Sequence, residues 1–175
     1  MKFKSLVILF LASIAICFSL NIEAQNSTKV DKGSGKQKAA SHDKKVKNEK
    51  SFVKFSDEAL AIMVKKADEL SVKGAAIIGF IPGDKTESWI TKMRVVGSFT
   101  NAKSNLLGIA YSKASDMAAT LQNSGTDKTR TVLQGEFGWQ GGLIKKIKTG
   151  YIIAVFSGGK TEQDLQIAQE GLNAL

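Results

Sequence analysis

The chain is poor in the residue types that build many catalytic and metal sites. Among its 175 residues there is one cysteine, Cys17, one histidine, His42, and one proline, Pro82. Cys17 lies in an apolar N-terminal run and His42 in a lysine-rich segment, so residues 53–175 contain neither residue type. These residues therefore cannot form a Ser-His-Asp triad, a histidine or cysteine metal site, a cysteine nucleophile or a disulfide.

The chain has no apolar run long enough to span a membrane, and its longest run, at the N-terminus, has the pattern of a secretory signal peptide. Lys2 and Lys4 precede an apolar run over residues 6–20, shorter than the roughly 20 residues that a membrane-spanning helix needs. We predict a signal peptide over residues 1–24, cleavage after Ala24, and a periplasmic or extracellular location. A lipoprotein anchor at Cys17 is disfavoured, because Ile16 before it is not a small residue.

A basic segment follows the predicted cleavage site. Over residues 26–54, nine lysines stand against three acidic residues, a net charge of +6, and apolar residues are nearly absent. Such a composition cannot offset the entropy of ordering, so we predict a disordered linker over residues 25–52. Residues 55–175 hold fourteen Lys and Arg against twelve Asp and Glu. The linker either solubilises the chain or attracts an anionic envelope surface, and nucleic acid is not an expected partner.

Residues 53–175 predict one α+β domain. Ser56 and the acidic residues after it indicate a helix N-terminus, and apolar residues recur at helical spacing behind it. Helices are expected over residues 56–73, 101–122 and 161–175, and strands over residues 75–81, 87–96, 131–137, 142–148 and 151–156. The order α-β-β-α-β-β-β-α favours a largely antiparallel sheet flanked by helices.

Residues 157–161, Ser-Gly-Gly-Lys-Thr, follow a predicted strand and open a predicted helix, as a phosphate-binding loop would. The match fails because Ala154 stands where that motif needs its first glycine. Two interpretations remain. The backbone amides at Gly158 and Gly159 could hold a carboxylate or phosphate group at the positive end of the helix, or the glycines only turn the chain and Thr161 only caps it.

The acidic residues of the domain fall mostly at predicted helix starts and turns, which is typical of caps and solvated charges rather than of paired catalytic carboxylates. Trp139, in Gly138-Trp139-Gln140-Gly141-Gly142, is expected to be a core or interface aromatic rather than a platform for a ligand.

The last 35 residues carry several motifs in a fixed order. They are Gly141-Gly142-Leu143-Ile144, a hairpin that ends in Ser157-Gly158-Gly159, and a helix that begins near Gln163-Asp164 and ends in Ala168-Gln169-Glu170-Gly171-Leu172. Upstream, a Lys113-Ala114 pair lies on the long predicted helix. This set resembles the GlcG/HbpS-like haem-degrading domain family. The chain departs from the pattern of this family at three places: Ile144 replaces the usual proline, Ala154 replaces a common glycine, and Val96-Gly97 replaces Asp-Gly.

The resemblance implies a domain that forms homo-oligomers and, in some members, binds or degrades haem. We therefore expect an exported, oligomeric protein that binds haem, a related tetrapyrrole or another anionic small molecule. Haem degradation would use the iron of the bound haem, and no catalytic residue is assigned. The candidate ligand-binding residues are Tyr111, Lys113, Met117, Gly141, Gly142, Ser157, Gly158 and Gly159.

The residues leave the role of these candidates open. Without a histidine in the domain, the axial ligand of a haem would be Met, Tyr, Lys or a hydroxyl group, and Lys113 could pair with a propionate. Each candidate is also explained by ordinary packing. The alternative function is a non-enzymatic envelope interaction module tethered by its basic linker.

Overall fold

The computed structural model describes residues 46–175. The predicted signal peptide, its cleavage site at Ala24, Cys17, His42 and most of the predicted linker lie outside the described residues. No helix among residues 46–175 is long and apolar enough to cross a membrane.

Four strands form one antiparallel sheet. They are β1 (Gly74–Pro82), β2 (Ile90–Val96), β3 (Gly142–Ile147) and β4 (Gly150–Ser157), in the spatial order β2-β1-β4-β3. The two central strands, β1 and β4, are almost entirely buried. This is why their sequences are nearly continuous apolar runs rather than alternating patterns.

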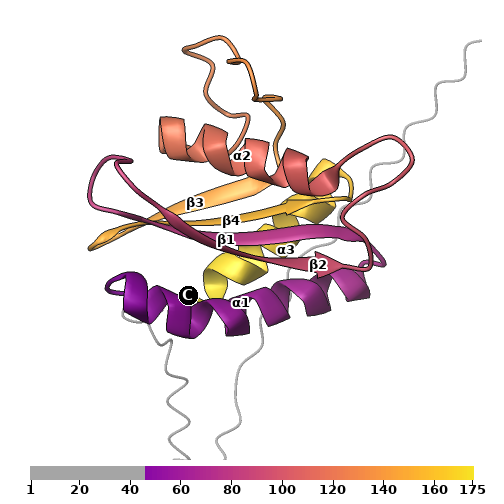
Figure 1. Ribbon diagram of the computed structural model, residues 1–175, viewed down its shortest axis with the longest axis horizontal. Helices are drawn as coiled ribbons and strands as arrows, with labels where there is room; N and C mark the ends of the chain where they lie inside the picture. Colours follow the sequence, from indigo (N-terminus) through magenta and orange to yellow (C-terminus); the bar gives the residue numbers. More distant parts are fainter. Residues whose placement is uncertain (1–45) are drawn as a thin grey trace, which may run out of the picture. The chain divides into compact units, whose positions relative to one another are not determined.

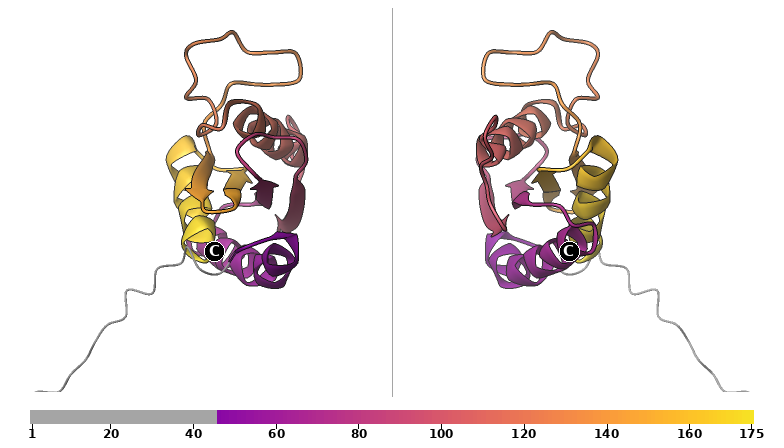
Figure 2. Two further views of the ribbon diagram at one scale, coloured as in Figure 1. Left: turned by 90° about the vertical axis from the view of Figure 1, so that its left-hand side faces the viewer. Right: turned by 90° about the vertical axis from the view of Figure 1, so that its right-hand side faces the viewer.

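Helices cover both faces of the sheet (Figures 1 and 2). The first and last helices, α1 (Glu49–Glu69) and α3 (Thr161–Asn173), pack together on one face, and α2 (Leu106–Thr120) packs on the other. Successive side chains of a strand point to opposite faces. Ile78 of β1 therefore joins the core under α1 and α3, while its neighbour Ile77 joins the core under α2. The predicted α+β class and the antiparallel sheet are confirmed.

Helix α1 begins at Glu49, before the expected start at Ser56. Asn48 caps it, since its side chain accepts a hydrogen bond from the Ser51 N–H at 2.9 Å. Phe52 is fully buried and stacks on Phe80 of β1, with ring centroids 6.1 Å apart. The ordered domain therefore includes residues 46–52, which the sequence assigns to the linker, because apolar anchors at Val46 and Phe52 fix this lysine-rich stretch to the core.

One predicted strand is wrong. Residues 131–137 form turns and irregular loop, so the order of elements is α-β-β-α-β-β-α. The other boundaries shift by a few residues. Helix α2 starts at Leu106 instead of residue 101, because the Asn105 side chain accepts a hydrogen bond from the Gly108 N–H and fixes the cap there.

Candidate functional site

Lys113 of α2 is a predicted ligand-binding residue that the structure places inside the protein. Its side chain is 4% exposed, and its ammonium group donates hydrogen bonds to Asp164 Oδ2 at 2.8 Å and to the Phe156 carbonyl at 3.0 Å. Asp164 belongs to the first turn of α3, and its side chain is equally buried. Lys113 therefore joins the helix on one face of the sheet to a helix on the other, and it lines neither of the two pockets described below.

Asp164 occupies the place that an external anion would take at the start of α3. Its Oδ1 accepts the Gly159 N–H at 2.9 Å, and the neighbouring Gly158 N–H acts on the same carboxylate. Burial raises the pKa of the Asp164 carboxyl, while Lys113 and the two glycine N–H groups act in the opposite direction. The arrangement favours the structural interpretation of the Ser-Gly-Gly-Lys-Thr segment, because its amides bind a carboxylate of the same chain.

Gly141 and Gly142 are packed against the same cluster. Gly141 has a φ of +127°, and a Cβ there would clash with Lys113 Nζ and lie 3.0 Å from Asp164 Cβ. A Cβ at Gly142 would lie 2.9 Å from the sulfur of Met117, which is fully buried. These glycines therefore permit a close approach of protein groups rather than of a ligand.

Tyr111 lies apart from the other candidates. It is 37% exposed, and its hydroxyl is 3.4 Å from Thr91 Oγ1 of β2. Lys113 and Met117, by contrast, are enclosed by protein. The three side chains do not line one open pocket, so they do not fit as a site for haem iron. Ser157, another candidate, is buried at the end of β4 with its carbonyl packed against Gly74.

An open pocket of about 410 Å³ lies beside the N-terminus of α2. Phe137 and Trp139 form one side of it, with ring centroids 4.8 Å apart and planes at 22°. Each residue is about half exposed, at 50% and 51%. We call this site the aromatic pocket; its lining is Lys103, Ser104, Asn105, Gly108, Ile109, Phe137 and Trp139.

The two aromatic residues belong to a loop over residues 123–141 that contains no helix or strand. Figure 1 shows this loop rising from the side of α2 that faces away from the sheet. Sequence patterns did not reveal the site, because residues 131–137 resemble an apolar strand. The signal against a strand was the recurrence of glycine at positions 135, 138 and 141, all of which have positive φ.

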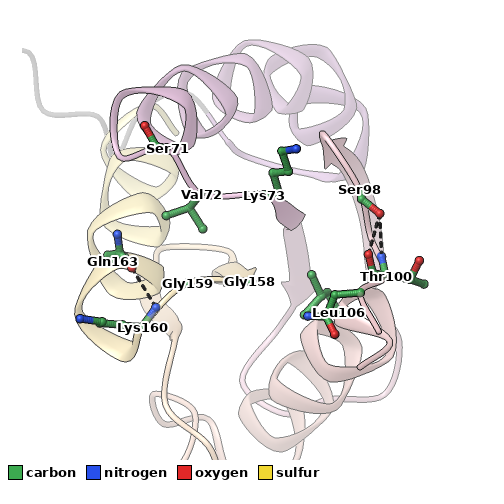
Figure 3. A pocket seen from close by; sticks show the side chains of 11 residues that line it. Ser71, Val72, Lys73, Ser98, Thr100, Leu106, Gly158, Gly159, Lys160 and Gln163 are labelled. Carbon is green, nitrogen blue, oxygen red and sulfur yellow. Dashed lines mark hydrogen bonds between the residues drawn. The ribbon is translucent and has the colours of Figure 1, made fainter. Parts of the chain in front are cut away.

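A second open pocket, of about 460 Å³, lies where three loops meet at one end of the sheet (Figure 3). Its lining includes Lys73, Lys160 and Gly159. The Lys160 side chain extends away from the pocket in Figure 3, and the Lys160 N–H donates to Gln163 Oε1 at 3.0 Å. Since Gly159 donates to Asp164, the amides that an anion would need already have partners. The aromatic pocket is therefore the better candidate.

No family model and no curated protein matches the chain. Among solved structures, it is similar to the crystal structure of the Klebsiella pneumoniae protein ORFY, which is described by the family model DUF336. The TM-score is 0.47 and the sequence identity 21%, over 68% of this chain and 86% of that one. DUF336 is the GlcG-like family that the sequence motifs resemble.

Proposed function

We propose that the protein is exported and binds a flat, largely apolar ligand with a carboxylate group, haem or a related tetrapyrrole being the leading candidate. The observation that supports this proposal is the stacked, half-exposed pair of Phe137 and Trp139 beside a pocket of about 410 Å³. Pockets of this size are typical of small-molecule sites, and a planar ligand gains both stacking and apolar burial on such a surface.

The charge of the aromatic pocket supports a ligand with an acidic group. Lys103 is its one charged lining residue among the residues that the structure describes. Asn105 is occupied with capping α2, so its side chain is held in place. A carboxylate that hangs from a flat ring can pair with Lys103 while the ring lies on Trp139.

The lining fits the ring of a tetrapyrrole but does not fit a haem iron. It contains no histidine, methionine, cysteine or tyrosine, the usual ligands of haem iron. Of the other candidate ligands, we assign the Lys103 amine to the carboxylate of the ligand, and Ser104 offers only a neutral hydroxyl group, a weak iron ligand. We therefore propose binding through the ring and its carboxylates and derive no reaction at the iron. It follows that metal-free protoporphyrin should bind about as tightly as haem.

The test is a titration of residues 25–175 with haem and, separately, with metal-free protoporphyrin, followed by absorbance. We expect saturable binding of both, and about tenfold weaker binding of both to a Trp139→Ala variant. A Trp89→Phe variant is the control, because Trp89 lies outside the pocket lining and phenylalanine keeps an aromatic ring against the core under α2. The absence of saturable binding for either compound contradicts the proposal, and tight binding of haem alone contradicts a site that does not ligate iron.

A second candidate function, an interaction module, is favoured by the tip of the same loop. Val132 and Leu133 are more than half exposed on the loop that also exposes Phe137 and Trp139, and a group of exposed apolar side chains is typical of an interaction surface. We propose that a second copy of the chain covers them. A Leu133→Lys variant should then have a lower mass by light scattering than the unsubstituted chain, and an equal mass contradicts the proposal.

The basic linker is a separate part of this second candidate. We propose that its lysines attract an anionic envelope surface. Deletion of residues 26–45 leaves the core anchors Val46 and Phe52 in place and should reduce sedimentation with anionic vesicles without affecting porphyrin binding. Undiminished sedimentation contradicts the role of the linker.

A further inference from the structure

The loop over residues 123–141 holds two large aromatic rings in the open without a helix or strand to support them. Such a loop needs other contacts to keep one conformation, because ordering its backbone has a large entropic cost. The Arg130 guanidinium supplies several of these contacts. It donates hydrogen bonds to Glu136 Oε1 at 3.0 Å and Oε2 at 2.8 Å, and to Asp116 Oδ1 of α2 at 2.8 Å.

The two carboxylates bound by Arg130 hold further points of the loop. Glu136 Oε2 also accepts the Leu133 N–H at 3.1 Å, which closes the turn at the loop tip. Asp116 Oδ2 accepts the Gly125 N–H at 2.7 Å, near the start of the loop. One guanidinium group therefore connects the beginning of the loop, its tip and helix α2.

These contacts reach the aromatic pair through the next residue of the chain. Phe137 follows Glu136, and its own N–H donates to Ser112 Oγ of α2 at 3.1 Å. The Phe137 ring then stacks on Trp139. With the side chain of residue 136 and the backbone of residue 137 both fixed, the orientation of the ring pair is determined by contacts that lie outside the pocket lining.

The charges around Arg130 make it hard to replace. Asp127 is a third carboxylate near the guanidinium, at 3.6 Å from Nε, and all three acidic side chains are no more than 10% exposed. The hydrogen bond from Arg130 holds the pKa of Glu136 below its ordinary value, so the carboxylate stays charged. Without Arg130, three enclosed negative charges would repel one another, and the loop would open to hydrate them.

We propose that Arg130 is the positioning residue of the aromatic pocket: it sets the conformation of residues 123–141 in which Phe137 and Trp139 face the ligand, without lining the pocket itself. This inference rests on the proposed function for its effect on ligand affinity. Its structural part, the position of Trp139, is tested without any ligand.

The experiment uses residues 25–175 with Trp89→Phe, so that Trp139 is the only tryptophan. Arg130→Ala should increase acrylamide quenching of Trp139 at least about twofold and weaken protoporphyrin binding about tenfold, with an unchanged far-UV circular dichroism spectrum. Arg94→Ala is the matched control. It removes the same charge from the face of β2 that packs on α1, and it should change neither measurement.

Two milder variants make the test decisive if Arg130→Ala fails to fold. Arg130→Lys keeps the charge but cannot form two parallel hydrogen bonds with Glu136, and Glu136→Gln removes the acceptor charge. Both should shift quenching and affinity in the same direction as Arg130→Ala, by a smaller factor. Quenching equal to the parent in both overturns the positioning role.

The two proposals fail in distinguishable ways. If the parent protein binds no porphyrin, the proposed function is overturned, while altered Trp139 quenching in the Arg130 variants still supports the positioning role. If the parent binds porphyrin and Arg130→Lys and Glu136→Gln leave quenching and affinity unchanged, the function stands and the role of Arg130 is overturned.

Discussion

Two charged residues of helix α2, three positions apart, hold two loops in different ways. Lys113 pairs with a single carboxylate, that of Asp164, and both side chains are almost completely buried. Asp116 shares Arg130 with two other acidic residues, and the Arg130 side chain is 27% exposed. The amides of the loop beside Lys113 bind the Asp164 carboxylate of the same chain. The loop held by Asp116 and Arg130 instead presents aromatic rings to solvent. A glycine-rich motif is therefore no evidence of a ligand until its amides are shown to be unoccupied.

The two clusters also shift carboxyl pKa values in opposite directions. At Asp164, burial outweighs the attraction of Lys113, and the pKa is raised. At Glu136, the hydrogen bond from Arg130 outweighs desolvation, and the pKa is lowered. An ion pair stabilises its carboxylate only where the hydrogen bonds and attraction exceed the loss of hydration. The comparison predicts a structural role for the buried pair and a local, positional role for the Arg130 cluster.

The largest expected effect is the loss of the buried cation. Lys113→Met leaves the Asp164 carboxylate without a counter-charge in the interior, so the free energy of unfolding should fall by about 3–5 kcal/mol, measured by urea denaturation. The control is Lys66→Met on α1, which breaks a surface pair with Glu69 and should lower stability by no more than about 1 kcal/mol.

A double variant tests the cause of that loss. In Lys113→Met with Asp164→Asn, the side chain of residue 164 is neutral and can still accept the Gly159 N–H. At least half of the lost stability should return. Equal stability of the single and double variants would show that packing, rather than an unpaired charge, explains the effect.

The next effect concerns the glycine that lies against the buried pair. Gly141→Ala should lower the free energy of unfolding by about 3 kcal/mol, because it combines positive φ with a clash against Lys113 Nζ, which two buried hydrogen bonds hold in place. Gly135→Ala is matched to it, since Gly135 has a φ of +94° but a Cβ added there would meet no atom within 4 Å. The Gly135→Ala variant should lower the free energy of unfolding by about 1 kcal/mol, from backbone strain alone. Equal losses of stability in the two variants would show that a clash with Lys113 does not contribute.

Much of the fold could be predicted from the sequence, because the elements are local patterns. The buried strands β1 and β4 are unbroken apolar runs, and the periodicity of α2 and α3 locates both helices within a few residues. The start of α1 could not be predicted, since Phe52 is anchored by Phe80, which lies far along the chain. Two apolar residues in a lysine-rich stretch gave no local sign of that contact.

The candidate site was harder to predict for the same reason. The partner of Lys113 lies 51 residues away, and the contact between Arg130 and Asp116 joins a loop to a helix. Sequence patterns identify Lys113, Gly141 and Gly158 as unusual positions, and the structure does bring them together. They do not show that Asp164 fills the space between them, nor that Trp139 stays exposed.

The smallest effect is a difference in pH dependence between the two clusters. For Asp164, whose pKa is raised above 3.8, the folded protein holds a proton that the unfolded chain has lost, so stability falls as pH rises through that window. For Glu136, whose pKa is lowered below 4.5, the unfolded chain binds the extra proton, so stability rises with pH up to about that value. Urea denaturation between about pH 3 and 7 should therefore show that Asp164→Asn becomes relatively more stable than the parent as pH rises, and Glu136→Gln relatively less. Slopes of the same sign would mean that desolvation and hydrogen bonding balance in the same way at the two carboxylates, and the contrast between the two loops would lose its electrostatic basis.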